Sequence, residues 1–333
     1  MRELQYVRAD DPGAAVELVA GHAEAAFLGG GTNLVDHLKL GVASPELLVD
    51  VRGLPLDSVA EFEDDSGSGL RVGANVRNSD LAAHPTIRTR YPVVARALLA
   101  GASAQIRHQA TTAGNLLQRT RCVYFQDVTT PCNKRDPGSG CSALDGYGRY
   151  NAILGASASC VSTHPSDLAV ALTAVDAAVV VLGPEGERRV PIEQLHRLPG
   201  DSPDRDTTLA RGELITAIEL PGETATPRST YRKVRDRASY AFALVSVAAV
   251  LRLEEGVVRD VRVAWGGVAH KPWRSHRLEA ALRGLRLDEE TVRAAVDEEL
   301  AAAETHDQTA YKIPMLRNVT TMTLLHLSEE GSR

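Results

Sequence analysis

The stretch Ala25-Ala26-Phe27-Leu28-Gly29-Gly30-Gly31-Thr32-Asn33-Leu34 passes from an apolar run through three glycines into a helical pattern. Residues 25–28 predict a short buried strand, and residues 34–40 predict a helix that ends at Gly41. A second apolar run follows at residues 47–51. This order predicts a small βαβ unit with parallel strands.

The rest of the chain mixes helical and strand patterns around one long irregular segment. The 333 residues predict two or three domains, with a main boundary near residue 225 and a weaker one near residue 55. Residues 101–155 show little periodicity, and a loop of that length inside a compact domain is usually functional. Expected helices cover residues 12–20, 79–84, 86–100, 166–175, 278–282 and 289–303, and expected strands cover residues 59–62, 70–72, 177–182 and 213–220. Residues 241–253 and 257–264 predict long strands or a mixture of strand and helix.

Composition excludes several classes of partner. The chain has 37 Lys and Arg against 43 Asp and Glu, a formal charge of −6, so no basic excess favours nucleic acid. The most apolar stretch, residues 168–182, is interrupted by Thr173 and Asp176 and is too short to span a bilayer. Because the N-terminal residues have no apolar signal core, we expect a cytoplasmic protein, or a periplasmic one if a partner subunit carries the export signal.

The glycine run is typical of a phosphate-binding turn. Glycines between a strand and a helix leave bare backbone N–H groups near the helix start, where an anion is favoured. The pattern is not G-x-G-x-x-G, because Leu34 stands where the third glycine belongs, and it lacks the lysine of a P-loop. A tight turn without a ligand remains the alternative.

Two further polar motifs follow along the chain. Thr111-Thr112-Ala113-Gly114-Asn115-Leu116 offers hydroxyl and amide groups for a phosphate or a flavin edge, or forms an ordinary polar turn. His164-Pro165-Ser166-Asp167-Leu168 offers a helix cap or a carboxylate for the sugar hydroxyls of a nucleotide.

The ten histidines form no metal-binding spacing, and we expect His108, His164 and His270 to be structural.

All four cysteines fall between residues 122 and 160, with spacings C-x9-C, C-x8-C and C-x18-C. Two disulfides, a zinc site and an iron–sulfur cluster are the alternatives, and the absence of a signal core makes disulfides the weakest. The spacings lack the C-x2-C pairs of most zinc sites. Nearby Arg119, Arg121, Lys134 and Arg135 suit an anionic cluster, or form a solvated basic face.

The order of these motifs resembles that of the FAD-binding subunits of the molybdenum hydroxylases, the xanthine dehydrogenase and aldehyde oxidoreductase family. Residues 27–34 resemble its first pyrophosphate loop, residues 111–115 its second, and residues 164–168 its third flavin contact. Arg235-Asp236-Arg237-Ala238-Ser239-Tyr240-Ala241 and Gly266-Gly267-Val268-Ala269-His270-Lys271-Pro272-Trp273-Arg274 resemble signatures of the C-terminal domain.

The cysteine segment is similar to that of the periplasmic aldehyde oxidoreductase type, whose flavin subunit carries an additional [4Fe–4S] cluster. Arg121-Cys122-Val123-Tyr124-Phe125-Gln126-Asp127 and Pro131-Cys132-Asn133-Lys134-Arg135 carry this similarity. The 4-hydroxybenzoyl-CoA reductases also place a cluster in this subunit and are the next alternative, with the xanthine dehydrogenases. The resemblance implies the cluster ligands Cys122, Cys132, Cys141 and Cys160.

The resemblance implies an α+β fold that is α/β in its N-terminal part. A PCMH-type FAD-binding domain at residues 1–225, with subdomains 1–55 and 56–225 and a cluster loop at 119–160, precedes a C-terminal α+β domain at 226–333 with a small antiparallel sheet. The implied FAD-binding residues are Phe27, Leu28, Gly29, Gly30, Gly31, Thr32, Asn33, Leu34, Thr111, Thr112, Gly114, Asn115, Asp167 and Lys233.

The implied function is electron transfer inside a molybdenum-dependent aldehyde oxidoreductase complex. A large molybdopterin subunit and a small subunit with two [2Fe–2S] clusters are the implied partners, and electrons leave through FAD to an external acceptor. No catalytic acid or base is expected in this chain. Two alternatives of other classes are a stand-alone FAD reductase that uses NAD(P)H and a zinc-stabilised scaffold subunit without flavin.

Overall fold

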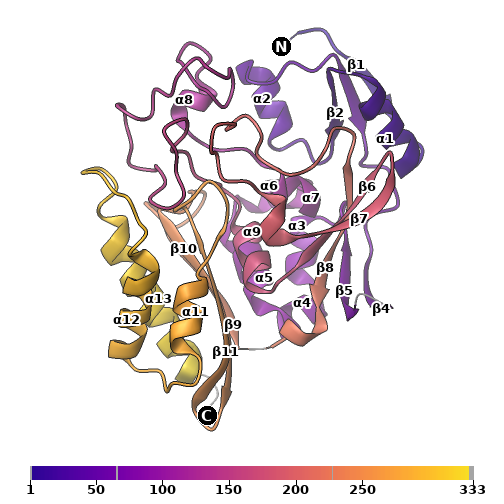
Figure 1. Cartoon of the computed structure of the whole chain (residues 1–333). Helices are drawn as coiled ribbons and strands as arrows, with labels where there is room; N and C mark the ends of the chain where they lie inside the picture. The colour runs from indigo at the N-terminus through magenta and orange to yellow at the C-terminus, as the bar shows by residue number, and fades with distance from the viewer. Residues whose placement is uncertain (1, 65–66, 227, 330–333) are drawn as a thin grey trace.

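The computed structural model describes residues 2–64, 67–226 and 228–329, which form three sheets flanked by helices (Figure 1). The N-terminal sheet has parallel strands in the order β1-β3-β2, so the predicted βαβ unit is confirmed. Asp11 caps the first helix by accepting a hydrogen bond of 2.8 Å from the Ala14 N–H. The elements are β1 (Gln5–Arg8), α1 (Pro12–Gly21), β2 (Ala25–Leu28), α2 (Leu34–Leu40) and β3 (Leu47–Asp50), of which β1 was not predicted.

A second sheet has five strands in the order β4-β5-β8-β6-β7, and each neighbouring pair is antiparallel. Its strands are β4 (Val59–Asp64), β5 (Gly67–Gly73), β6 (Ala178–Gly183), β7 (Gly186–Pro191) and β8 (Leu214–Pro221). The turn expected at residues 64–69 lies partly outside the described residues.

Helices pack beside this sheet and lead into the irregular segment. The single helix expected over residues 86–100 is wrong, because Pro92 has no N–H to continue a helix and instead starts a new one. The irregular segment expected at residues 101–155 is wrong in its first half, because three short helices occupy residues 104–109, 112–116 and 123–126. From residue 127 to residue 166, all of it described, the chain has no helix or strand beyond isolated bridges. The helices are α3 (Asn78–Ala83), α4 (Pro85–Arg90), α5 (Pro92–Ala100), α6 (Ala104–Gln109), α7 (Thr112–Leu116), α8 (Val123–Gln126), α9 (Asp167–Ala174) and α10 (Ile192–Leu195).

The C-terminal part forms a four-stranded antiparallel sheet in the order β12-β11-β10-β9. The expected helices near residues 278–282 and 289–303 are present, whereas the long last helix and β9 were not predicted. After η1 (Gly222–Thr224), the elements are β9 (Ser229–Val234), β10 (Val245–Glu254), β11 (Val257–Gly266), β12 (Trp273–Arg274), α11 (His276–Leu282), α12 (Glu289–Leu300) and α13 (Lys312–Glu329).

This small sheet is buried on both faces, because alternate residues of a strand point to opposite sides. Ala248 and Val250 of β10 join the core that contains α5 and α9. Val247 and Leu251, on the other face of the same strand, pack with α11, α12 and α13. The sheet therefore holds the C-terminal helices against the N-terminal two thirds of the molecule (Figure 1).

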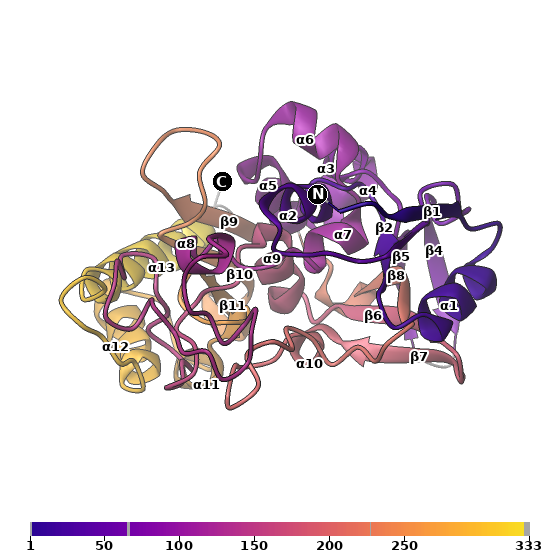
Figure 2. The ribbon, with the colours of Figure 1, turned by 90° about the horizontal axis from the view of Figure 1, so that it is seen from above.

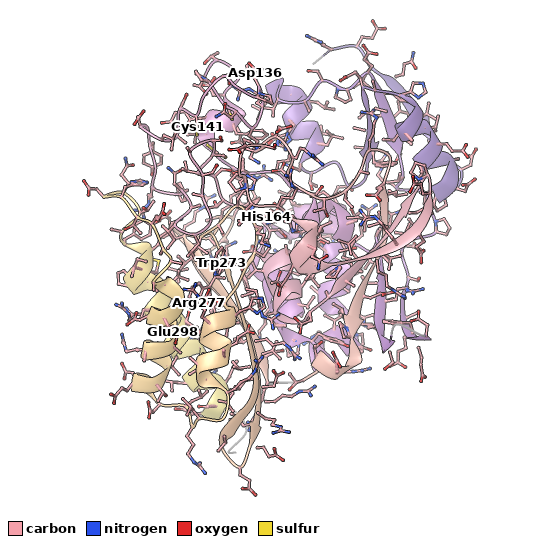
Figure 3. All side chains as sticks on the ribbon, in the orientation of Figure 1. Asp136, Cys141, His164, Trp273, Arg277 and Glu298 are labelled. Carbon is pink, nitrogen blue, oxygen red and sulfur yellow. The ribbon has the colours of Figure 1, made fainter. Side chains whose placement is uncertain are left out.

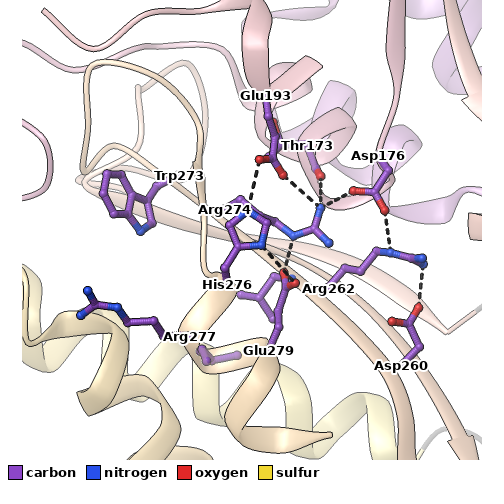
Figure 4. A network of polar contacts seen from close by, with 12 residues as sticks. Thr173, Asp176, Glu193, Asp260, Arg262, Trp273, Arg274, His276, Arg277 and Glu279 are labelled. Atoms are coloured by element: carbon purple, nitrogen blue, oxygen red, sulfur yellow. Dashed lines mark hydrogen bonds and ion pairs between the residues drawn. The ribbon is translucent and has the colours of Figure 1, made fainter. Parts of the chain in front are cut away.

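Arginines reinforce this junction in a polar network (Figure 4). Arg274, 6% exposed, donates to the Thr173 carbonyl at 2.7 Å and pairs with Asp176 and Glu279. Arg262 pairs with the same Asp176 at 2.7 Å. Because Thr173 and Asp176 lie at the end of α9 while Arg262 lies on β11, the network connects the two parts of the chain.

The irregular cysteine segment lies over one end of the C-terminal helices and close to α2, as the two ribbon views show (Figures 1 and 2). The Tyr311 hydroxyl donates to the Arg149 carbonyl at 2.8 Å and holds the segment there. In the part of the chain that is described, no helix combines the length and apolar character needed to cross a membrane.

Candidate functional site

A cavity of about 660 Å³ opens where the N-terminal unit, the α6–α7 segment, α9 and the C-terminal sheet meet. This volume lies within the range of cofactor sites. Of the residues expected to bind the cofactor, Thr32, Asn33, Gly114, Asn115, Asp167 and Lys233 line the cavity. The structure places the others, Phe27, Leu28, Gly29, Gly30, Gly31, Leu34, Thr111 and Thr112, outside its lining.

The glycine loop approaches the second motif closely. A Cβ on Gly30 would lie 2.9 Å from the Ala110 Cα and even nearer to the Gln109 carbonyl oxygen, so no side chain fits there. The Gln109 side chain also donates to the Gly30 carbonyl at 3.1 Å. Gly30 therefore lets the two loops pack together, and the packing brings Thr32 and Asn33 to the cavity.

The second motif supports the cavity wall from behind. Thr111 caps α7 by accepting from the Gly114 N–H at 3.2 Å. The fully buried Thr112 donates to the Gly73 carbonyl at 2.9 Å, which anchors α7 on β5. Asn115 accepts a hydrogen bond of 2.7 Å from Ser166, which also caps α9. The second and third motifs are thus joined directly.

Asp167 and Lys233 form a buried ion pair of 2.8 Å at the cavity wall. The Tyr231 hydroxyl donates to the other oxygen of the Asp167 carboxylate. Burial raises the pKa of Tyr231 well above its usual value, and the neighbouring carboxylate adds to the shift. Tyr231 was missed in the sequence, because a tyrosine on a β-strand carries no signal beyond that of a core residue.

Some buried polar atoms of the cavity lining have no hydrogen-bond partner within the chain. Buried polar atoms in native proteins almost always have a hydrogen-bond partner, so each exception needs an explanation. Four residues of the cavity lining have a buried side-chain atom without a partner in the structure: Asn78 Oδ1, Arg121 Nε, His164 Nε2 and Ser246 Oγ. Donors and acceptors of this kind fit a polar cofactor, and their positions could not be predicted from sequence motifs.

His164 belongs to a buried cluster with His196 and His270. The rings of His164 and His196 lie 4.3 Å apart between centroids. Burial lowers the pKa of His196 and of His270 to about 4 and also lowers that of His164. His164 and His270 therefore stay neutral at pH 7 inside the fold. A structural role for both stays a prediction, since His164 also lines the cavity.

The four cysteines line a second, small cavity, and all four are free thiols. A bridge pairs the backbones of Cys132 and Cys141. Burial raises the pKa of the Cys122 thiol, and the backbone N–H groups of Phe125 and Tyr124 oppose that rise. Within the described residues, no three His, Cys, Asp or Glu side chains are arranged to hold a single metal ion.

Cationic side chains hold the cysteine loop in place. Lys134, 1% exposed, donates to the Pro203 carbonyl at 2.8 Å and pairs with Asp206. Arg119 pairs with the same carboxylate at 2.6 Å. Burial would raise the pKa of Asp206, but Arg119 and Lys134 hold it well below its usual range. Of the four basic residues singled out in the sequence, Lys134 is thus internal, whereas the side chains of Arg119 and Arg121 are 29% and 24% exposed.

The two cavities adjoin, because Thr120, Cys122 and Ser162 line both of them. Ser162 is 5% exposed, and its hydroxyl lies 3.3 Å from the Cys160 sulfur. In Figure 3 the Cys141 label marks the irregular segment, and His164 lies toward the centre of the molecule. The large cavity and the cysteine cavity therefore share part of their lining.

Comparison with known proteins agrees with this arrangement. The model of the FAD binding domain in molybdopterin dehydrogenase matches residues 2–223, and that of the CO dehydrogenase flavoprotein C-terminal domain matches residues 229–326. The aldehyde oxidoreductase FAD-binding subunit PaoB of Escherichia coli (strain K12) is 51% identical over 283 residues, covering 85% of this chain and 86% of that protein. The glyceraldehyde dehydrogenase medium chain of Sulfolobus acidocaldarius is 26% identical and covers 87% and 85%.

Solved structures share the fold over nearly the whole length. A structure of carbon monoxide dehydrogenase from Hydrogenophaga pseudoflava superposes with a TM-score of 0.73 at 26% identity, covering 97% of this chain and 96% of that one. Quinoline 2-oxidoreductase from Pseudomonas putida 86 gives a TM-score of 0.74 at 19% identity, covering 99% and 98%, and shows the fold alone. The chain therefore belongs to the FAD-binding medium subunits of the molybdenum hydroxylase family and is an oxidoreductase subunit.

Proposed function

We propose that this chain carries FAD and a [4Fe–4S] cluster in an aldehyde oxidoreductase complex and passes electrons to an external acceptor. The observation that carries the proposal is the pair of adjoining cavities, one lined by the flavin motifs and one by all four cysteines. The identity of 51% to an aldehyde oxidoreductase FAD-binding subunit supports the choice of aldehydes over xanthine.

Residues of three motifs would hold the flavin nucleotide. Thr32 and Asn33 would bind its phosphates, with Gly114 and Asn115 on the same side of the cavity. Asp167, oriented by Tyr231 and Lys233, would accept hydrogen bonds from sugar hydroxyls. FAD accepts electrons singly or in pairs, and this property lets the subunit join one-electron iron–sulfur centres to a two-electron acceptor.

The cysteine cavity suits a cluster better than a single ion. A [4Fe–4S] cluster takes one thiolate at each iron, so its ligands surround a volume and need not converge on one point. The N–H groups that face the Cys122 sulfur, from Tyr124 and Phe125, are the hydrogen-bond donors that such a site requires. The nearby cations Arg119 and Lys134 would balance negative charge on the thiolates.

The proposal assigns aldehyde oxidation to partner subunits. Conversion of an aldehyde and water to a carboxylic acid releases two electrons and two protons, and we place that step at molybdenum in a large subunit. A small subunit with two [2Fe–2S] clusters would relay the electrons to this chain. We propose a cytoplasmic complex, or a periplasmic one if a partner carries the export signal.

Metal and flavin analysis of the purified complex tests the proposal. We expect flavin absorption with a broad iron–sulfur shoulder, one FAD per chain, and iron beyond that of the small subunit. Cys132→Ser should lose the additional iron and keep the flavin. Zinc in place of that iron would contradict the cluster, absence of flavin would favour a scaffold subunit, and NAD(P)H turnover by the isolated chain would favour a stand-alone reductase.

A further inference from the structure

Four cationic side chains line the large cavity, and three of them are engaged within the chain: Arg107, Lys233 and Arg237. Lys233 pairs with Asp167 at 2.8 Å. Arg107 donates to the Gly101 carbonyl at 2.6 Å, and Arg237 donates to the Tyr240 carbonyl at 3.0 Å. The fourth, Arg121, keeps unused hydrogen-bonding capacity.

Arg121 has one distant counterion. Its Nη1 lies 3.7 Å from the Asp36 carboxylate, beyond hydrogen-bond distance, and its buried Nε has no partner in the structure. The side chain is 24% exposed, while that of Asp36 is 49% exposed. The ion pair of 3.7 Å is too long for a hydrogen bond, so it satisfies the partly buried guanidinium only in part and leaves room for a closer anion.

An aromatic ring also holds the Arg121 side chain in position. Its guanidinium lies over the Phe242 ring, 5.0 Å from the centroid. Guanidinium donors all lie in the plane of the group, so a ring on one face leaves the N–H edge free. Phe242 comes from the loop between β9 and β10 and also lines the cavity. The guanidinium is thus held by stacking, a contact that uses none of its N–H donors.

The surroundings indicate which anion would complete the site. Thr32 and Asn33, from the glycine loop, line the same cavity, and Asp36 lies on the helix that follows them. The pyrophosphate of a dinucleotide carries two negative charges. Bound next to the glycine loop, it would supply a close counterion for Arg121. We propose that Arg121, held by Phe242, binds the pyrophosphate of FAD, an inference that rests on the proposed binding of FAD in this cavity.

The test compares flavin binding by variants of the purified complex after its flavin has been removed. Arg121→Gln keeps a polar, uncharged amide on a shorter side chain and removes the guanidinium charge, and we expect FAD affinity to fall roughly tenfold to hundredfold, as for loss of a charge-assisted contact. The affinity for riboflavin, which has no phosphate, should stay the same. FAD binding should also depend less on salt concentration in this variant, because salt screens the attraction between the guanidinium and the phosphates and the variant lacks that attraction.

Asp36→Asn is the matched control at the same site. Removing this carboxylate takes away a negative charge beside the expected phosphate, so FAD should bind as tightly as in the unchanged protein or more tightly. Arg121→Lys keeps the charge without the planar donors, and we expect an intermediate FAD affinity.

The outcomes separate this inference from the proposed function. Failure of the unchanged complex to take up FAD would contradict the proposed function itself. Normal FAD uptake together with unchanged affinity in Arg121→Gln would overturn the role of Arg121. An equal loss for FAD and riboflavin would also overturn it, since it would indicate contact with the flavin ring or a fold defect shared by both ligands.

Discussion

Two oppositely charged residues, Asp167 and Lys233, are buried together at the cavity wall. The side chains of Asp167 and Lys233 are 9% and 3% exposed, and each is the other's counterion. The sequence suggested Asp167 as a carboxylate for sugar hydroxyls, but it could not show that Lys233 and Tyr231 already hold it. Those contacts join α9 to a strand more than 60 residues later, and no local pattern reports such a pairing.

Lys233→Met should strongly destabilise the fold. The substitution leaves the Asp167 carboxylate buried with Tyr231 as its remaining side-chain donor, and breaking a buried ion pair costs about 3–5 kcal/mol. Urea unfolding of the purified chain measures this loss. The control is Arg149→Met, which breaks the exposed pair with Asp236 and removes the contact with the Tyr311 ring, and it should destabilise the fold far less. An equal decrease in the free energy of unfolding in both variants would show that the buried ion pair stabilises the fold no more than the exposed one.

Ser162 should tune the cluster that we propose. Its hydroxyl would donate to the Cys160 thiolate, and hydrogen bonds to cluster sulfurs raise the reduction potential. At about 1 kcal/mol for the bond, Ser162→Ala should lower the one-electron potential by about 40 mV with iron content unchanged.

The control for Ser162 lies in the same cavity. The Ser142 hydroxyl donates to the Pro131 carbonyl at 2.9 Å and not to sulfur, so Ser142→Ala should leave the potential unchanged. A redox titration followed by electron paramagnetic resonance distinguishes the two variants. The same potential in Ser162→Ala and the unchanged protein would refute the tuning role.

At the scale of elements, the glycine loop depends on steric clearance. We expect Gly30→Ala to weaken both folding and flavin binding, because its Cβ would meet the backbone of Gln109 and Ala110. A shift of either loop would displace Thr32 and Asn33 from the cavity. Thermal unfolding and bound flavin per chain measure the effect. Gly21→Ala, at a position where a Cβ meets nothing within 4 Å, is the control and should leave both values near those of the unchanged protein.

Elements with a strong local pattern were predictable, and those defined by distant partners were not. The βαβ unit and α9 follow from apolar periodicity and capping residues, whereas the segments of β10 and β11 were predicted only as long strands or a mixture of strand and helix. All four residues of β1 are exposed, so the strand lacks the alternation of buried and exposed residues that marks a strand in the sequence. Helix α13 was missed because its buried residues include Lys312 and three threonines, which give it no simple apolar stripe.

The lining of the cavity, too, was predictable from the sequence only in part. The motifs at residues 32–33, 114–115 and 167 predicted part of its lining. Asn78, Arg121, Phe242 and Ser246 also line it, but they belong to segments that the tertiary fold brings together. Sequence motifs locate the backbone turns of a site, whereas its side-chain partners depend on packing between domains.

At the scale of the whole molecule, the C-terminal domain completes the site begun by the N-terminal one. Lys233, Phe242, Ser246 and Gly267 line the cavity from the C-terminal sheet and its loops. Lys312, at the start of α13, reaches the same wall from behind and donates to the carbonyls of Asn151 and Gly267 at 2.7 Å each. The last helix is thus connected to the cavity through one buried lysine.

This lysine should make stability depend on pH. Burial lowers the pKa of Lys312 from 10.5 to about 7, and Arg149 adds to the shift. Below pH 7 the lysine is charged in both states, so the folded state bears the full cost of burying the charge. Between about pH 7 and 10.5 the unfolded chain binds more protons than the folded one, and stability therefore rises with pH across that window.

We expect the contribution of Lys312 to increase the free energy of unfolding by roughly 2 kcal/mol from pH 7 to pH 9. Other groups titrate in this range, so the informative quantity is the difference between the unchanged protein and Lys312→Met, measured by urea unfolding at both pH values. The variant should lack this rise, although it leaves the carbonyls of Asn151 and Gly267 without their donor and is less stable throughout. Parallel pH profiles for the two proteins would show that Lys312 keeps its proton in the fold, with its two carbonyl partners outweighing the cost of burial.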